Sequence, residues 1–346
     1  MTVPTDKEPL MNRDALIGAI PKVELHLHLE GTLEPELAFS LAQRNGVVLP
    51  YASASEMRAA YRFTDLQSFL DIYYASCSVL RREQDFYDLT RAYLERAAAD
   101  NVRHVEPFFD PQTHTDRGVP YAVVVGGITR ALDDARSGSG ITSCLIACAL
   151  RHATADGAMK MLEEAIFSPY QVQGLGLDSS ETGNPPSKFA AAFDRARAAG
   201  LHAVAHAGEE GPPSYITDSL DLLHAERIDH GVRCLEDPAL VARLVRDKVC
   251  LTVCPNSNVA LRVVERMEDH PLRRMLDAGL RVTVNSDDPA YFGGYIGDNF
   301  RGVADALDLS DAQLVTLSAN AIDGSFASSE RKAELRAELR DVVNRV

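Results

Sequence analysis

Two histidines, His26 and His28, stand two positions apart in the apolar segment 23–29. In a β-strand, side chains at positions i and i+2 point to the same face, so these two imidazoles would converge. Neutral imidazoles are good ligands for a divalent metal ion such as zinc. Two surface histidines on a half-exposed strand would show the same spacing, so the pair alone does not establish a metal site.

Three further apolar segments also end in side chains that bind metals or transfer protons. They are 202–207 with His206 followed by Glu209, 227–230 with His230, and 280–286 followed by Asp287 and Asp288. Taken singly, His206 could equally be a hydrogen-bonded core histidine. Barrel enzymes place their catalytic groups at the carboxyl ends of strands, so clusters at four strand ends together indicate one metal-dependent active site.

The elements that must position these residues follow a regular order. Short apolar segments rich in β-branched residues alternate with helical segments, the pattern of a parallel sheet with crossover helices. The eight segments are 23–29, 102–108, 141–150, 171–177, 202–207, 227–230, 249–254 and 280–286. Eight strands favour an α/β fold closed into a (β/α)8 TIM barrel, with an open doubly wound sheet as the alternative. We predict one domain over residues 1–346.

The first connection is long and helical, with predicted helices at 35–45, 66–80 and 84–99. We expect segment 32–100 to form a helical insertion that caps the barrel mouth, because a structureless loop of this length is uncommon. The polar residues 1–13 are expected to be a disordered leader. The charged segment 328–346 is expected to be a solvated terminal helix.

The composition excludes several classes of protein. A formal net charge of −15 opposes binding to nucleic acid and to anionic membrane surfaces. No apolar segment approaches the length of a membrane span, and no secretory signal is visible. Six cysteines without regular spacing are typical of reduced thiols. We therefore expect a soluble, cytoplasmic protein.

The strand-end motifs, in their order along the chain, resemble the adenosine and adenine deaminases of the amidohydrolase superfamily. The matching motifs are His26-x-His28, His206-Ala207-Gly208-Glu209, Asp229-His230-Gly231 and Ser286-Asp287-Asp288-Pro289, supported by 21–24 and 252–258. The resemblance covers nearly the whole chain. It implies a TIM barrel and a hydrolytic deamination at C6 of a purine.

The resemblance also assigns roles to these residues. It implies one Zn²⁺ per chain, which activates a water molecule and is held by His26, His28, His206 and Asp287. It implies that His230 orients the attacking water and helps to take its proton. Glu209 would protonate the purine nitrogen N1, and Asp288 would hydrogen-bond to N7.

Three segments favour adenine deaminases over adenosine deaminases within this resemblance: 106–114, 176–189 and 287–295. Ser179 belongs to the motif Ser179-Ser180-Glu181, where adenosine deaminases usually carry Gly-Asp-Glu, and is expected to border the substrate. Glu30 stands where those enzymes commonly have Asp. From residue type, we expect Tyr291, Phe292 and Tyr295 to fill the space that a ribose would need.

The expected activity is therefore conversion of adenine and water to hypoxanthine and ammonia in purine salvage, with a small-molecule purine as the only predicted partner. The alternative is a deaminase of adenosine or of another adenine-containing nucleoside. A remote alternative is a non-catalytic purine-binding barrel, which would require the loss of a ligand or of the acid. A second class of zinc deaminase combines HxE with PCxxC. Here His104 and Glu106 match the first half but no PCxxC follows, so His104 is expected to be structural.

Overall fold

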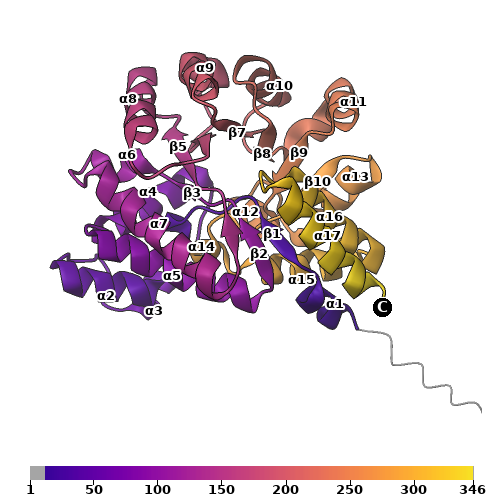
Figure 1. Cartoon of the computed structure of the whole chain (residues 1–346), viewed down its shortest axis with the longest axis horizontal. Coiled ribbons are helices and arrows are strands. Elements are labelled where there is room, and N and C mark those ends of the chain that lie inside the picture. Colours follow the sequence, from indigo (N-terminus) through magenta and orange to yellow (C-terminus); the bar gives the residue numbers. More distant parts are fainter. Residues whose placement is uncertain (1–11, 346) are drawn as a thin grey trace, which may run out of the picture.

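All eight predicted strand segments form parallel strands at the centre of the molecule (Figure 1). The computed structural model describes residues 12–345. Its strands are β1 (Lys22–Glu24), β2 (Val102–Val105), β3 (Phe108–Phe109), β4 (Thr142–Ser143), β5 (Ile146–Leu150), β6 (Gly174–Asp178), β7 (His202–Ala207), β8 (Arg227–His230), β9 (Cys250–Val253) and β10 (Arg281–Val284). The predicted segments 102–108 and 141–150 are each split into two short strands. Pro107 contributes to the first break, because proline has no N–H for the ladder.

The strands close into a barrel through the residues that follow β1. One sheet has the order β10-β9-β8-β7-β6-β5-β3 and the other β1-β2-β4. Leu27 bridges to Asp287 on one side, and His28 bridges to Phe108 on the other. The His28 N–H donates to the Asp287 carbonyl at 3.0 Å, and the Phe108 N–H donates to the Leu27 carbonyl at 2.8 Å. The two edges of the larger sheet therefore meet at residues 27 and 28, and the predicted TIM barrel is confirmed.

Helices surround the strands, and the main apolar core lies between the two layers. The helices are α1 (Arg13–Ala19), α2 (Pro35–Asn45), α3 (Ala54–Ala59), α4 (Leu66–Ser76), α5 (Glu83–Ala99), α6 (Pro111–Thr115), α7 (Tyr121–Gly138), α8 (Ala155–Phe167), α9 (Ala190–Ala198), α10 (Pro213–Leu222), α11 (Pro238–Asp247), α12 (Pro255–Ala260), α13 (Leu272–Asp277), α14 (Pro289–Phe292), α15 (Ile296–Ala306), α16 (Asp311–Gly324) and α17 (Ser329–Val343). A smaller cluster contains Phe108, Ile146, Cys148 and Val204, all from barrel strands.

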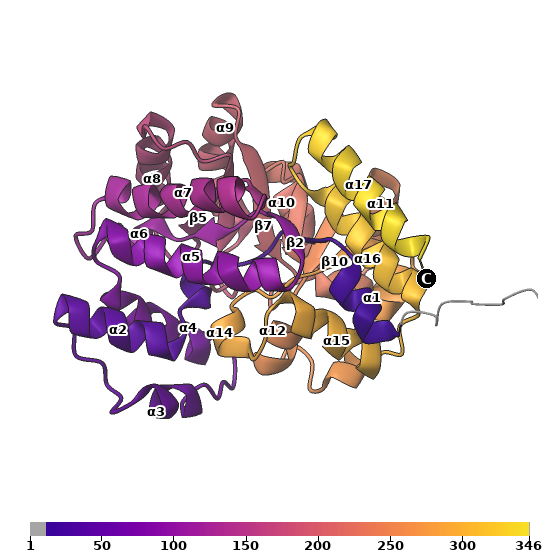
Figure 2. The same ribbon diagram turned by 60° about the horizontal axis from the view of Figure 1, so that its bottom comes forward.

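The segment after β1 is helical, as predicted, but its helices lie in two places. Helices α2, α3 and α4 gather on one side of the molecule, with α14 beside α4 (Figure 2). Helix α5 packs instead against α7 and β2, in the layer of helices around the barrel. Helix α4 starts at a capping box in which the Asp65 carboxylate accepts the Ser68 N–H at 2.8 Å.

The expected disordered leader, residues 1–13, falls largely outside the described residues. Its last two positions are ordered, because the Asn12 side chain caps α1 and Arg13 is the first residue of that helix. Over residues 12–345, no helix combines the length and apolar character needed to cross a membrane. All six cysteines are free.

Candidate active site

Four side chains from three strand ends meet at the carboxyl end of the barrel. His26 and His28 follow β1, His206 lies near the end of β7, and Asp287 follows β10. Their potential ligand atoms all lie within 4.8 Å of one another, and all four residues are buried. His26 Nε2 is 3.2 Å from Asp287 Oδ1, and His28 Nε2 is 3.2 Å from His206 Nε2.

The Nδ1 atom of each of these histidines points away from the metal-binding group and lies near an oxygen that can accept a hydrogen bond from it. The partners are the Thr252 carbonyl at 3.2 Å for His26 Nδ1, Asp178 Oδ2 at 3.5 Å for His28 Nδ1, and Asp229 Oδ2 at 3.4 Å for His206 Nδ1. With a hydrogen on each Nδ1, the Nε2 lone pairs are free to bind one common metal ion. Metal-binding histidines are usually oriented in this way by a hydrogen bond from their other ring nitrogen. His26 Nε2 has no hydrogen-bond partner in the described chain. The donor set therefore fits a divalent metal ion.

Burial favours the neutral form of two imidazoles, the form that binds metals: it lowers the pKa of His28 to about 4, and it also lowers the pKa of His206. Burial acts in the same direction on His26, but the charge of Asp287 outweighs it and raises the pKa of His26 above its usual value. Burial has the opposite tendency for Asp287, but His26 and the other imidazoles outweigh it and hold the pKa of this carboxyl well below its usual range.

Glu209 and His230 lie beside the metal-binding group. His230 Nε2 is 3.4 Å from Glu209 Oε2 and 3.9 Å from Asp287 Oδ2. Glu209 Oε1 is buried and has no hydrogen-bond partner among residues 12–345. Burial, and then the charge of Asp287, raise the pKa of Glu209 well above its usual value. A protonated carboxyl with a free oxygen can act as a general acid here.

The buried carboxylate of Glu181 fixes the backbone of the loop that carries Glu209. Glu181 accepts the backbone N–H groups of Gly208 at 3.1 Å, Glu209 at 2.9 Å and Gly211 at 3.1 Å. Gly208 has a φ of 73°, a conformation that favours glycine. The loop that carries Glu209 is therefore fixed by hydrogen bonds to one side chain from the neighbouring strand-end segment.

The last strand end directs two adjacent carboxylates to different places. Asp287 has a φ of 64°, which is uncommon for a residue with a side chain, and it faces the metal-binding group. Asp288 lines the pocket, and its Oδ1 atom is buried without a partner in the described part of the chain. A Cβ atom on Gly31 would lie 2.0 Å from that same oxygen, so only glycine allows this approach.

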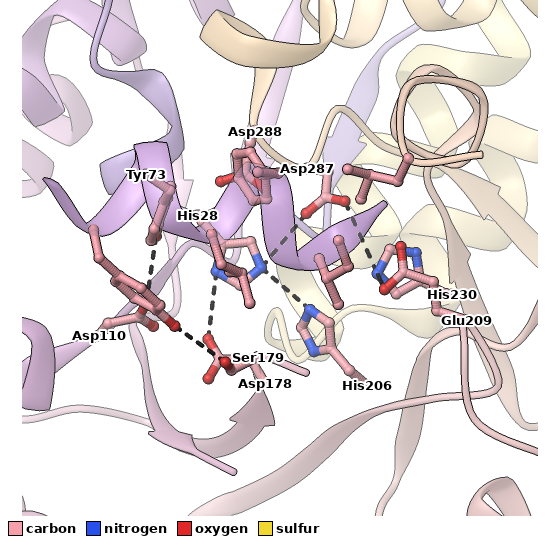
Figure 3. A pocket seen from close by; sticks show the side chains of 15 residues that line it. His28, Tyr73, Asp110, Asp178, Ser179, His206, Glu209, His230, Asp287 and Asp288 are labelled. Carbon is pink, nitrogen blue, oxygen red and sulfur yellow. Dashed lines mark hydrogen bonds and ion pairs between the residues drawn. The ribbon is translucent and has the colours of Figure 1, made fainter. Parts of the chain in front are cut away.

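Helix α4 forms one wall of the pocket above these groups. It is lined by His28, Leu66, Phe69, Leu70, Tyr73, Tyr74, Asp110, Asp178, Ser179, His206, Glu209, His230, Leu261, Asp287 and Asp288 (Figure 3). Ser179 lies at its rim, where its Oγ atom is 3.1 Å from Tyr74 Oη and 2.8 Å from His152 Nδ1. Ser179 has a φ of 71°.

The expectation that Tyr291, Phe292 and Tyr295 form the aromatic wall is wrong, because none of them lines the pocket. Tyr291 and Phe292 pack behind Phe69 of α4, with ring centroids 5.4 Å and 4.7 Å away. Tyr295 Oη hydrogen-bonds to Glu34. The wall itself comes from Phe69, Tyr73 and Tyr74 in the long insertion.

The structure brings together all eight residues predicted from the sequence: seven line the pocket, and His26 lies beside them in the metal-binding group. Sequence reasoning missed Asp110, Asp178 and Glu181. Asp110 and Asp178 stand at strand ends, so the rule that identified His206 and His230 could have found them. His104, expected to be structural, is buried against Thr142 and Glu106 and does not line this pocket.

Comparisons with known proteins agree with this geometry. A family model described as adenosine deaminase matches residues 21–342. An adenine deaminase of Sphingopyxis alaskensis is 60% identical over 93% of this chain and 94% of its own. An adenine deaminase of Paraburkholderia phytofirmans is 58% identical over 96% of this chain and 95% of its own.

Two solved structures are similar over nearly the full chain. The crystal structure of an adenine deaminase from Arthrobacter aurescens has a TM-score of 0.93 at 56% identity, covering 94% of this chain and all of that chain (100%). An amidohydrolase from Burkholderia ambifaria, with bound Zn, has a TM-score of 0.88 at 31% identity, covering 98% of this chain and 96% of its own. The barrel, the convergent histidines and these similarities together show that the chain belongs to the adenosine and adenine deaminase family of the amidohydrolase superfamily.

Proposed function

We propose that this protein is an adenine deaminase, which hydrolyses adenine to hypoxanthine and ammonia. The observation that carries the proposal is a buried acid with a free oxygen, Glu209, beside four convergent metal-binding side chains in a pocket with α4 along one wall. The adenine deaminases that share 58–60% of its sequence support the same substrate. Six free cysteines support a cytoplasmic location.

We propose one zinc ion per chain, held by His26, His28, His206 and Asp287. When bound, zinc lowers the pKa of a water molecule and so supplies a nucleophile near neutral pH. The zinc-containing amidohydrolase of Burkholderia ambifaria supports this choice of metal.

The chain's own residues would then bind the purine and move protons. Glu209 donates a proton to N1, which allows C6 to be attacked without charge accumulating on the ring. His230, 3.4 Å from Glu209 and 3.9 Å from Asp287, orients the attacking water and accepts its proton. Asp288 hydrogen-bonds to N7, and Ser179 contacts the far edge of the base. Helix α4 acts as a cap that excludes bulk water from the pocket.

The substrate is tested by steady-state kinetics on adenine and adenosine with the same zinc-loaded enzyme. We expect a kcat/KM for adenine that exceeds the value for adenosine by several orders of magnitude, because Phe69, Tyr73 and Tyr74 of α4 line the pocket and would crowd a ribose. A preference for adenosine would replace the proposed substrate with the nucleoside and would leave the deamination chemistry unchanged.

The metal is tested by elemental analysis and chelation. We expect one zinc per chain and loss of activity after exhaustive chelation, with recovery when zinc is returned. Two metal ions per chain, or full activity in the chelated protein, would contradict the proposed site.

A further inference from the structure

Two carboxyl groups in the pocket have oxygens that the mechanism does not use. Asp110 and Asp178 are each 2% exposed, and both line the pocket. Asp110 Oδ2 is 3.4 Å from Tyr73 Oη, and Asp178 Oδ2 is 3.5 Å from His28 Nδ1. The Oδ1 atom of each carboxyl is buried and has no hydrogen-bond partner within residues 12–345. Burial and the neighbouring Asp178 raise the pKa of Asp110 well above its usual value, so the two carboxyls can share a proton. Each Oδ1 atom then still has a lone pair that can accept a hydrogen bond from a bound molecule.

The unpaired oxygens lie on the side of the pocket away from the general acid. In Figure 3, Asp110, Asp178 and Ser179 lie on one side of His28, and Glu209 and His230 lie on the other. The backbone N–H of Asp110 donates to Glu30 Oε1 at 3.1 Å, which fixes the start of this segment. Glu30 is itself buried and accepts from His114 Nε2 at 2.7 Å, so its carboxylate supports Asp110 and does not line the pocket.

The shape of adenine determines which of its edges faces these oxygens. C6 must lie near the point where the metal-binding side chains converge. N1 and N7 lie on either side of the 6-amino group. Glu209 is the partner of N1, and Asp288 is the partner of N7. The remaining edge of the base carries N3, which accepts a hydrogen bond, and N9, which carries a hydrogen in the free base. A carboxyl oxygen that accepts a hydrogen bond is the complement of the N9–H group, and the Ser179 hydroxyl can donate to N3.

We propose that Asp110 accepts a hydrogen bond from the N9–H group of free adenine and thereby selects the base over its nucleosides. The proposal rests on the adenine deaminase function given above. Asp178 holds His28 and presents its second oxygen beside that of Asp110. In a nucleoside, N9 carries a carbon and no hydrogen, so the Asp110 oxygen would remain unpaired and would also contact the sugar. Tyr73 lies next to Asp110, with its Oη atom 3.4 Å from Asp110 Oδ2.

The test compares adenine with 9-methyladenine in the wild-type enzyme and in Asp110→Leu, which keeps the size of the side chain and removes its acceptor oxygens. We expect the substitution to lower kcat/KM for adenine about 5- to 100-fold, the usual loss when a buried donor is left without a partner. The effect on 9-methyladenine should be several-fold smaller, because that substrate has no N9–H to lose. Inhibition constants for hypoxanthine and 9-methylhypoxanthine give the same comparison where turnover is slow.

Asp116→Leu is the matched control, since it makes the same substitution at an exposed residue just after α6. Thermal unfolding and zinc content establish that each variant is folded and loaded. An equal loss on both substrates, or no loss on adenine, would overturn the role of Asp110. Failure of the wild-type enzyme to deaminate adenine would instead overturn the proposed function, so the two failures are distinguishable.

Discussion

Among single residues, Glu209 has an environment unlike that of its neighbour Glu210. Both are glutamates in one loop, but Glu209 is 5% exposed and lines the pocket, whereas Glu210 is half-buried and does not. Glu181 accepts the backbone N–H of Glu209. The Glu209 carboxyl is therefore not needed for that hydrogen bond and can lie in the pocket. Burial raises the pKa of both carboxyls, so the chemistry assigned to Glu209 depends on a position in the pocket that Glu210 lacks.

Replacing the acid tests this role. Glu209→Gln keeps the size of the side chain but removes the transferable proton, so we expect kcat to fall by roughly 10²- to 10⁴-fold while zinc is retained. Steady-state kinetics and elemental analysis of the same sample are the measurements. The control, Glu210→Gln, should stay within a few-fold of wild type. A turnover close to normal in zinc-loaded Glu209→Gln would rule out Glu209 as the general acid.

At the scale of elements, helix α4 forms one wall of the pocket at the barrel mouth. Its buried face carries Phe69 and Tyr73, and Phe69 packs on Tyr291 and Phe292 of α14. Helix α4 is held over the site by this aromatic cluster and by hydrogen bonds from Tyr73 to Asp110 and from Tyr74 to Ser179. The cluster therefore determines how well the pocket closes on a small base.

Removing the aromatic ring of Phe69 tests how far this cluster holds α4 over the pocket. Phe69→Ala removes a buried aromatic side chain, a change that typically costs roughly 3–5 kcal/mol. We expect KM for adenine to rise about tenfold or more, with a smaller change in kcat, because binding must then also order α4. Gln67→Ala, on the exposed face of the same helix, is the control. An unchanged KM in Phe69→Ala would show that α4 does not close the pocket.

At the scale of the whole molecule, the site depends on closure of the barrel. His26 and Asp287 lie at opposite ends of the chain, and the hydrogen bonds at residues 27 and 28 bring them together. Buried polar groups elsewhere in the structure also depend on the complete fold. One of them is His270, which accepts the Leu272 N–H through Nδ1 at 3.1 Å and lies 3.1 Å from Asn258 Oδ1 through Nε2.

This histidine makes stability depend on pH. Burial lowers the pKa of His270 to about 4, from an ordinary value of 6.5 that the unfolded chain keeps. Between these values the unfolded state binds the proton and the folded state does not, so stability is present above pH 6.5 and is lost as pH falls toward 4. The full loss amounts to roughly 3 kcal/mol.

His270→Gln, which keeps a donor and an acceptor, should therefore show a shallower decline in the free energy of unfolding between pH 6.5 and pH 4. Urea unfolding at several pH values measures the difference in the free energy of unfolding between variant and wild type. The contributions of carboxylates and metal ligands, which both proteins share, cancel in this difference. A difference that stays constant across this range would mean that His270 does not titrate with folding.

The sequence alone determined the strands and the residues at their ends. His26 and His28 are two positions apart on one strand, and His206 and His230 end two others, so local periodicity was sufficient to predict that they share one rim. Which side chains fill the rest of the pocket was decided by tertiary structure. The aromatic wall was predicted from Tyr291, Phe292 and Tyr295, but Phe69, Tyr73 and Tyr74 of the insertion form it.

The physical reason is that a helix in a long connection can pack in many places, and its own sequence pattern shows only which face is buried. The same holds for Asp110 and Asp178, which lie 68 positions apart in the chain and meet only because β3, β5 and β6 are neighbours in the closed barrel. Spacing along a strand is local and can be read from the sequence, whereas contacts between the insertion and the barrel, or between distant strand ends, are set by packing and by the order of the strands.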